Sequence, residues 1–135
     1  MNGWMNGLLC TVLFMGWCAA AQAEELDPAE MERLGKLSGE VMLHAAVLKR
    51  LDVLCPRGAE GDYTGEIERD VKKMTEDFQA AFSLQLLTSQ KVGDFIVRDL
   101  LKKGGGCSAE RVAQARQQAE ERHREGLRQW RARGR

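Results

Sequence analysis

Residues 27–56 read DPAEMERLGKLSGEVMLHAAVLKRLDVLCP, and this stretch decides the fold of the chain. Its apolar side chains recur every three or four residues, which is the spacing of the buried stripe of an α-helix. The stripe consists of Leu34, Leu37, Val41, Leu48 and Leu51, with His44 and Cys55 in its two remaining positions. The sequence therefore predicts one long amphipathic helix over 28–55, and further helices must cover it.

Both ends of this helix are marked. Asp27 can cap the first turn, Pro28 suits the first helical position, and Glu30 lies where a capping box places its acid. Pro56 cannot continue the helix and stops it. At 1.5 Å per residue the helix is roughly 40 Å long, so it spans the whole domain.

Three more helices are expected after Pro56. The apolar spacing predicts one helix from Thr64 or Gly65 to Leu86, a turn or kink over 88–93, and a short helix over 94–103. A glycine hinge at 104–106 then leads to a last helix capped by Ser108. Its apolar stripe is thin, and we expect half of this helix to protrude into solvent. The predicted fold class is all-α: a small four-helix bundle or helical up-down array.

The first 23 residues have the character of an export signal. They contain no charged side chain, carry an apolar run, and end in an Ala-x-Ala sequence at Ala23, just before Glu24. We therefore interpret 1–23 as a signal peptide, 24–121 as the helical domain and 122–135 as an arginine-rich helix end or tail. An uncleaved membrane anchor that leaves the protein facing the periplasm is the alternative interpretation of 1–23.

Outside that segment the chain keeps two cysteines, Cys55 and Cys107. An even pair in an exported chain is most simply a disulfide. In an up-down-up-down bundle the first helix ends at the pole where the fourth begins, so the two sulfurs would meet there. Closing this loop would stabilise the fold by roughly 4 kcal/mol at most. The expected location is periplasmic or secreted.

Charge is balanced overall but unevenly distributed. The chain has 20 acidic and 20 basic residues, yet residues 24–103 hold 16 acids and 12 bases whereas 104–135 hold 4 and 8. A neutral exported chain is not expected to bind nucleic acid.

His44 and His123 are the only histidines and are the candidate metal ligands. If both helices run straight, their heights differ by roughly 7 to 8 Å, which does not suit one metal. Neither a nucleophile elbow nor a zinc-protease motif is present, so we expect no enzyme activity and no cofactor.

The basic tail is the most suggestive feature of the sequence. Its candidate partner-binding residues are Arg124, Arg128, Trp130, Arg131 and Arg133. Guanidinium groups pair with phosphate or carboxylate, and tryptophan prefers interfaces, so the tail could contact an acidic protein or an anionic membrane surface. The alternative is a solvated helix end whose arginines complement the helix dipole.

A long first helix that ends on Leu48-Lys49 and then Cys55, with a second cysteine about fifty residues on, loosely resembles the small pilotins that escort secretins. The leading hypothesis is an exported, non-enzymatic interaction protein that binds another protein: a periplasmic inhibitor, an immunity-type factor or an assembly chaperone. The alternatives are a membrane-associated, pilotin-like accessory protein and a small haem or metal carrier.

Overall fold

The computed structural model describes residues 27–133. This part of the chain is all-α and contains α2 (Pro28–Leu54), α3 (Gly65–Val71), α4 (Glu76–Gly104) and α5 (Glu110–Arg131). A disulfide joins Cys55 to Cys107, so the prediction of a disulfide-clamped helical array is confirmed. The predicted signal segment 1–23 lies outside the described residues.

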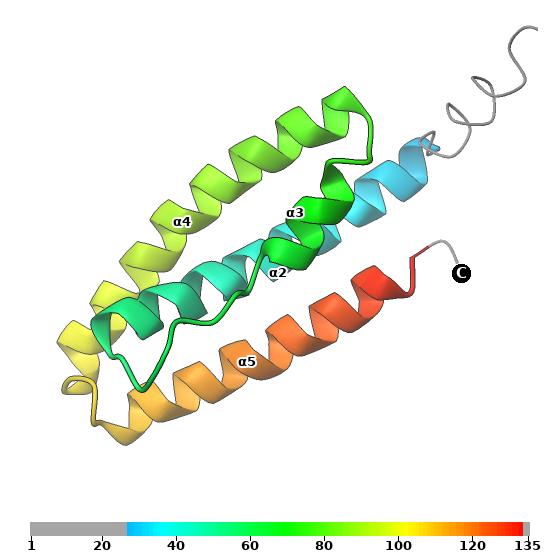
Figure 1. Ribbon diagram of the computed structural model, residues 1–135. Coiled ribbons are helices and arrows are strands. Elements are labelled where there is room, and N and C mark those ends of the chain that lie inside the picture. The colour runs from blue at the N-terminus through cyan, green and yellow to red at the C-terminus, as the bar shows by residue number, and fades with distance from the viewer. Residues whose placement is uncertain (1–26, 134–135) are drawn as a thin grey trace, which may run out of the picture.

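The central element is α2, which packs against α4 on one side and against α5 on the other (Figure 1). The two flanking helices hardly touch each other. The short helix α3 crosses over the half of α2 that lies away from the disulfide (Figure 1). The long apolar stripe of α2 is therefore shared between two helices that pack largely independently.

Two helix starts are fixed by side-chain caps. Asp27 accepts a hydrogen bond of 2.7 Å from the backbone N–H of Glu30, as the sequence predicts. Thr75 accepts one of 3.3 Å from the N–H of Phe78 and begins α4. At the other end of α4, Gly105 takes the left-handed conformation, with φ 91°, that commonly terminates a helix.

The predicted division of residues 64–104 is wrong in two places. The helix expected to run from Thr64 or Gly65 to Leu86 is broken after Val71, because Thr75 caps a new helix. The turn expected over 88–93 is continuous helix. Its small residues Ser89 and Gly93 are buried, so they form a packing surface and not a break.

Helix α5 also differs from expectation. Ser108 does not cap it; the capping position is Ala109, which makes no side-chain hydrogen bond. Nor does half of the helix protrude, because its buried positions run from Val112 to Trp130 along its whole length. Helix α5 runs without interruption across positions 121 and 122 to Arg131, so residues 122–131 form its arginine-rich end.

The core has two clusters, one at each end of α2. The cluster near the disulfide gathers Leu48, Leu51, Val97 and Val112. The cluster at the other end is larger, and its buried members are Leu34, Leu37, Val41, Met42, Ile67, Val71, Phe78, Phe82 and Trp130. Because α3 and the end of α5 both contribute to it, this second cluster packs the last turns of α5 against the rest of the molecule.

Two glycines let the flanking helices approach α2 closely. A Cβ on Gly93 of α4 would lie 2.7 Å from Ala46 Cβ and 3.0 Å from the Ala46 carbonyl carbon. A Cβ on Gly126 of α5 would lie 2.6 Å from Val41 Cγ2. Real side chains do not approach so closely, so each interface depends on the missing methyl group.

Within residues 27–133, no helix combines the length and the apolar character needed to cross a membrane.

Candidate functional site

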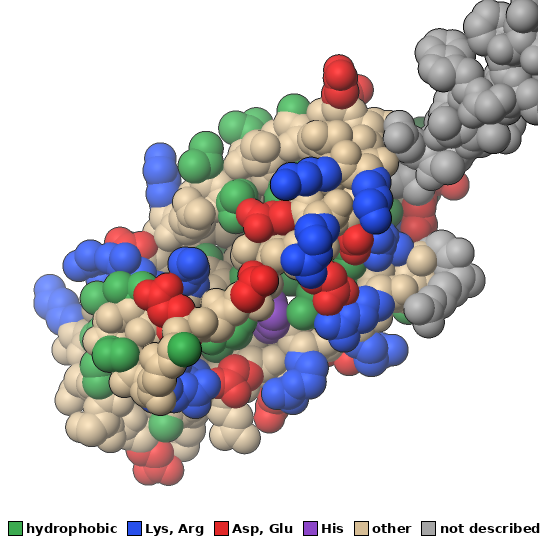
Figure 2. Space-filling view, in the orientation of Figure 1, with side chains coloured by type: hydrophobic (Ala, Val, Ile, Leu, Met, Phe, Trp, Pro, Cys, Tyr) green, Lys and Arg blue, Asp and Glu red, His purple; other side chains and the backbone are tan. Residues whose placement is uncertain are grey.

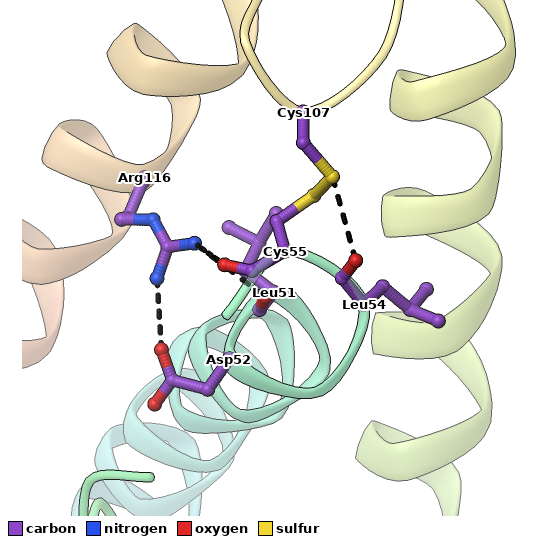
Figure 3. The surroundings of a disulfide bond; sticks show 6 residues. All are labelled: Leu51, Asp52, Leu54, Cys55, Cys107 and Arg116. Atoms are coloured by element: carbon purple, nitrogen blue, oxygen red, sulfur yellow. Dashed lines mark hydrogen bonds and ion pairs between the residues drawn. A yellow bond between two sulfur atoms is a disulfide. The ribbon is translucent and has the colours of Figure 1, made fainter. Parts of the chain in front are cut away.

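The disulfide closes the pole where α2 ends and the turn before α5 begins (Figure 3). The Cα atoms of Cys55 and Cys107 are 5.4 Å apart, and 52 positions separate them in sequence. Cys107 Sγ also lies 3.4 Å from the carbonyl oxygen of Leu54. A disulfide sulfur carries no hydrogen, so this is a packing contact. The covalent link is compatible with an oxidising compartment.

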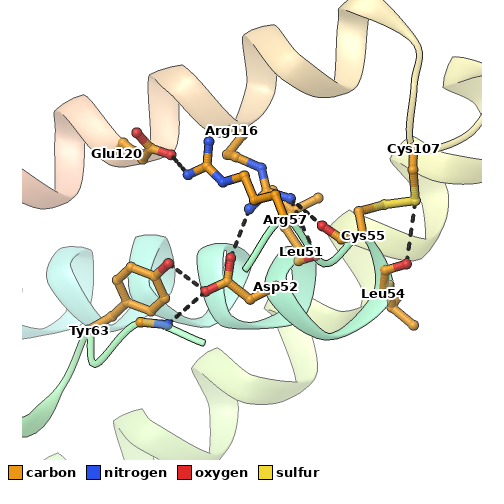
Figure 4. Close-up of polar contacts among 10 residues, drawn as sticks. Leu51, Asp52, Leu54, Cys55, Arg57, Tyr63, Cys107, Arg116 and Glu120 are labelled. Atoms are coloured by element: carbon orange, nitrogen blue, oxygen red, sulfur yellow. Dashed lines mark hydrogen bonds and ion pairs between the residues drawn. A yellow bond between two sulfur atoms is a disulfide. The ribbon is translucent and has the colours of Figure 1, made fainter. Parts of the chain in front are cut away.

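A buried ion pair supports the same pole. Arg116 of α5 donates a hydrogen bond of 2.8 Å to Asp52 and one of 2.7 Å to the carbonyl oxygen of Cys55 (Figures 3 and 4). Tyr63 Oη and the Gly61 N–H donate to the second oxygen of Asp52, at 2.6 and 3.0 Å. Both charged side chains are more than nine-tenths buried. Every oxygen of Asp52 is thus occupied, which suits a structural role.

The pKa values of this network follow from its geometry. Burial alone raises the pKa of Asp52, but the hydrogen bonds from Tyr63, Gly61 and Arg116 together lower it below its ordinary value. Burial, followed by the hydrogen bond to Asp52, raises the pKa of Tyr63 to about 12. At neutral pH the network therefore contains a carboxylate and a protonated phenol.

A hollow of about 560 Å³ lies beside the disulfide, lined in part by Pro56, Arg57, Gln117 and Glu120. Its charged groups pair with one another: Arg57 contacts Glu120 across the hollow, and Arg116 points to Asp52 (Figure 4). The Arg57–Glu120 contact thus faces the hollow, whereas the Arg116–Asp52 pair is buried.

The two histidines occupy separate settings. His123 is buried, donates a hydrogen bond of 2.7 Å from Nε2 to the carbonyl oxygen of Tyr63, and packs edge-on against the Tyr63 ring. His44 is partly buried, and burial, followed by the charge of Arg122, lowers its pKa. In residues 27–133, no three acidic, histidine or cysteine side chains gather as metal ligands would.

The arginine-rich end of α5 is docked onto α3. Arg131 forms an ion pair of 2.7 Å with Glu66, and Arg133 forms one of 2.9 Å with Asp70. Arg128 pairs within α5 with Glu125, at 2.6 Å. Three of the predicted partner-binding cations thus have acidic partners inside the molecule, and the fourth, Arg124, is exposed.

Trp130 requires a correction. We expected its indole at an interface among the arginines, but it has no exposed surface and belongs to the core. Its Nε1–H donates a hydrogen bond of 2.9 Å to Asp70, and the Arg133 guanidinium lies 4.6 Å from the ring centre. The indole anchors α5 to α3 and is not available to another molecule.

The outer side of α4 carries exposed apolar residues that the sequence pattern alone did not predict. Leu84, Leu87 and Phe95 are 68%, 57% and 71% exposed, and Val92 and Ile96 are also exposed. We call these five residues the outer apolar face of α4. Figure 2 shows hydrophobic side chains along the edge of the molecule that α4 forms.

This face is not the margin of the core. At about 100° per residue, Leu84 and Phe95 project in nearly the same direction, while the buried Gly93 lies about half a turn away. The helix thus has two apolar faces on opposite sides, and only one packs against α2. Phe95 lies on the side opposite Gly93 and is exposed, although its apolar spacing alone would also suit a core position. Ile96 lies about 60° from Gly93 around the helix, at the edge of the buried side, and is 39% exposed.

Comparison with known protein families, with curated proteins and with solved structures gave no match for this chain.

Proposed function

We propose that this chain is an exported, non-enzymatic helical protein that acts by binding another protein through the outer apolar face of α4. The observation that carries the proposal is the exposure of Leu84, Leu87 and Phe95 on one side of one helix, opposite its buried side. Single exposed apolar residues are common on protein surfaces, whereas an aligned set marks a contact site.

The chemistry of this face suits a protein partner. Leucine and phenylalanine at helical spacing are the anchors by which one amphipathic helix recognises another apolar surface. Lys91 and Arg98 are exposed among them, and their aliphatic stems can extend the apolar contact while the charged groups reach water. The ion pairs and hydrogen bonds near the disulfide, by contrast, are satisfied within the molecule.

Export is supported by two features. The uncharged, Ala-x-Ala-terminated segment 1–23 has the composition of a secretion signal. The disulfide is of the kind that forms outside the reducing cytosol. Together these features support a periplasmic or secreted location.

The test is site-specific photocrosslinking in the cells that make the protein. A photoreactive phenylalanine analogue in place of Phe95 should yield crosslinked protein adducts on irradiation. The same analogue at Gln118, an exposed position on α5, is the matched control. If both positions gave only the same background level of crosslinking, the proposal would be refuted.

A further inference from the structure

We propose that the occupant of the outer apolar face of α4 is a second copy of this chain, paired antiparallel through α4 about a two-fold axis. This inference rests on the proposed function and names the partner for that site. A two-fold interface must be self-complementary, since each surface meets its own copy. The sequence of α4 can therefore be tested for such a match.

Four of the five apolar residues of the face match in one register, and the fifth, Ile96, faces Ser83 of the other copy. Place the axis on the outer face of α4 at the height of the 89–90 peptide bond. Leu84 and Phe95 lie equally far from this point on opposite sides, and so do Leu87 and Val92. In an antiparallel pair, Leu84 of one copy then faces Phe95 of the other, and Leu87 faces Val92. Four apolar pairs result from the two copies.

The charges at the ends of α4 match in the same register. Glu76 and Lys103 are equally far from the axis, as are Asp77 and Lys102. All four side chains are exposed, and Lys103 also pairs within α4 with Asp99, at 3.1 Å. The acidic start of one helix therefore faces the basic end of the other, twice. The apolar residues alone set the register, so this agreement is an independent observation.

The remaining pairs along the face place no like charges opposite each other. Arg98 and Asp99 face Ala81 and Ala80, whose small side chains leave room for longer ones. Lys91 faces Thr88, and its aliphatic stem can cover apolar surface while the ammonium group reaches water. Like charges directly opposite one another would have destabilised the pair.

The face is also accessible to a second copy. Helix α4 forms one flank of the molecule, with α2 on its inner side and α5 beyond α2 (Figure 1). A contact through one helix pair lies at the lower end of the interface size range, so we expect a dimer that dissociates on dilution.

The register is tested by mixed disulfide crosslinking. L84C and F95C proteins of different tag size are mixed in a glutathione buffer that leaves the native disulfide intact. Both positions are exposed, so neither substitution disturbs the core. We expect the mixed L84C–F95C product to exceed either self-product at least several-fold. A parallel pair would instead favour self-products, and crosslinking no greater than that of Q118C would overturn the inference.

The charge match is tested by swapping. E76K/D77K should shift sedimentation toward monomer over a dilution series, because the new lysines would then face Lys102 and Lys103 of the other copy at each end of the pair. Adding K102E/K103E should restore the dimer. Circular dichroism melts establish that each variant is folded. Unchanged sedimentation of E76K/D77K would contradict the antiparallel register.

Failure of this inference differs from failure of the proposed function. A chain that stays monomeric throughout, yet crosslinks from position 95 to a different protein, refutes the second copy and retains the binding face. Phe95-dependent sedimentation with vesicles of phosphatidylcholine and phosphatidylglycerol, without dimer, refutes it in favour of a membrane surface. Background crosslinking at every position refutes both.

Discussion

Helices α4 and α5 flank the same central helix, but the chemistry of their outer surfaces is opposite. The end of α5 carries several cations, and three of them are neutralised within the molecule by Glu66, Asp70 and Glu125. The outer side of α4 carries leucines and a phenylalanine that nothing in residues 27–133 covers. The more conspicuous sequence feature therefore belongs to the fold, and the less conspicuous one faces outward.

The comparison shows why charge density is a weak guide to function. Cations that lie near acids of another helix can form ion pairs within the molecule. Exposed ion pairs of this kind add little stability. An apolar side chain opposite the core has no such internal partner. Exposure of Phe95, at 71%, is the more informative observation.

The largest expected difference in the free energy of unfolding is between truncation of Trp130 on α5 and truncation of Phe95 on α4. Trp130→Ala removes a fully buried indole and its hydrogen bond to Asp70, and should lower the free energy of unfolding by about 4 kcal/mol. Phe95→Ala should change it by less than about 0.5 kcal/mol. Urea unfolding at a dilution where the protein is monomeric measures both. Similar losses in the two variants would remove the contrast between the helices.

Loss of the buried Arg116–Asp52 ion pair should have the next largest effect on the free energy of unfolding. Asp52→Asn leaves the Arg116 guanidinium buried without its counter-ion and should cost about 3 kcal/mol in the free energy of unfolding. The control is Glu125→Gln, which removes the acid that pairs with the exposed Arg128; it should leave the urea midpoint unchanged. If Asp52→Asn proves as mild as this control, the α5 side is not held by its buried charge.

The two glycine contacts should differ by a smaller amount. Gly93→Ala forces a methyl group against the Ala46 backbone of α2 and should cost about 2 kcal/mol. Gly126→Ala meets only a valine methyl and gains helix propensity, so its net cost should stay below about 1 kcal/mol. Thermal melts of the two variants decide the order, and a greater loss for Gly126→Ala would reverse it.

A last effect is confined to alkaline solution and vanishes at neutral pH. Tyr63 is the one tyrosine of the chain, so an ultraviolet titration reports on it alone and should give a midpoint of about 12. Because the folded chain keeps this proton while the unfolded chain loses it near pH 10, stability should fall as pH rises from 10 toward 12. Phe95→Gln should leave the titration unchanged. An ordinary midpoint in the folded protein would mean that Asp52 does not hold the phenol.

Some of this arrangement could be predicted from local rules. The Asp27 cap and the Pro56 stop define α2, and the parity of Cys55 and Cys107 places the disulfide at one pole. These features depend on residues close in sequence, or on the direction in which helices alternate. For that reason, helix α2 and the disulfide could be predicted from the sequence.

Other features depend on what packs opposite a residue. Ser89 and Gly93 indicated a turn, yet both are buried in continuous helix, and Gly93 lies in close contact with α2. Thr75 followed by two acids was a readable helix start that the apolar spacing concealed. Trp130 and Phe95 both lie in apolar patterns, and only the tertiary contacts show that one is buried and the other exposed.

The sparse contact between α4 and α5 has a consequence for how the chain can change. Each flank is fitted to α2 separately, so substitutions on the free side of one need no compensating repacking in the other. Natural variation can therefore change the apolar character of the exposed α4 surface while the packing of the other helices stays the same.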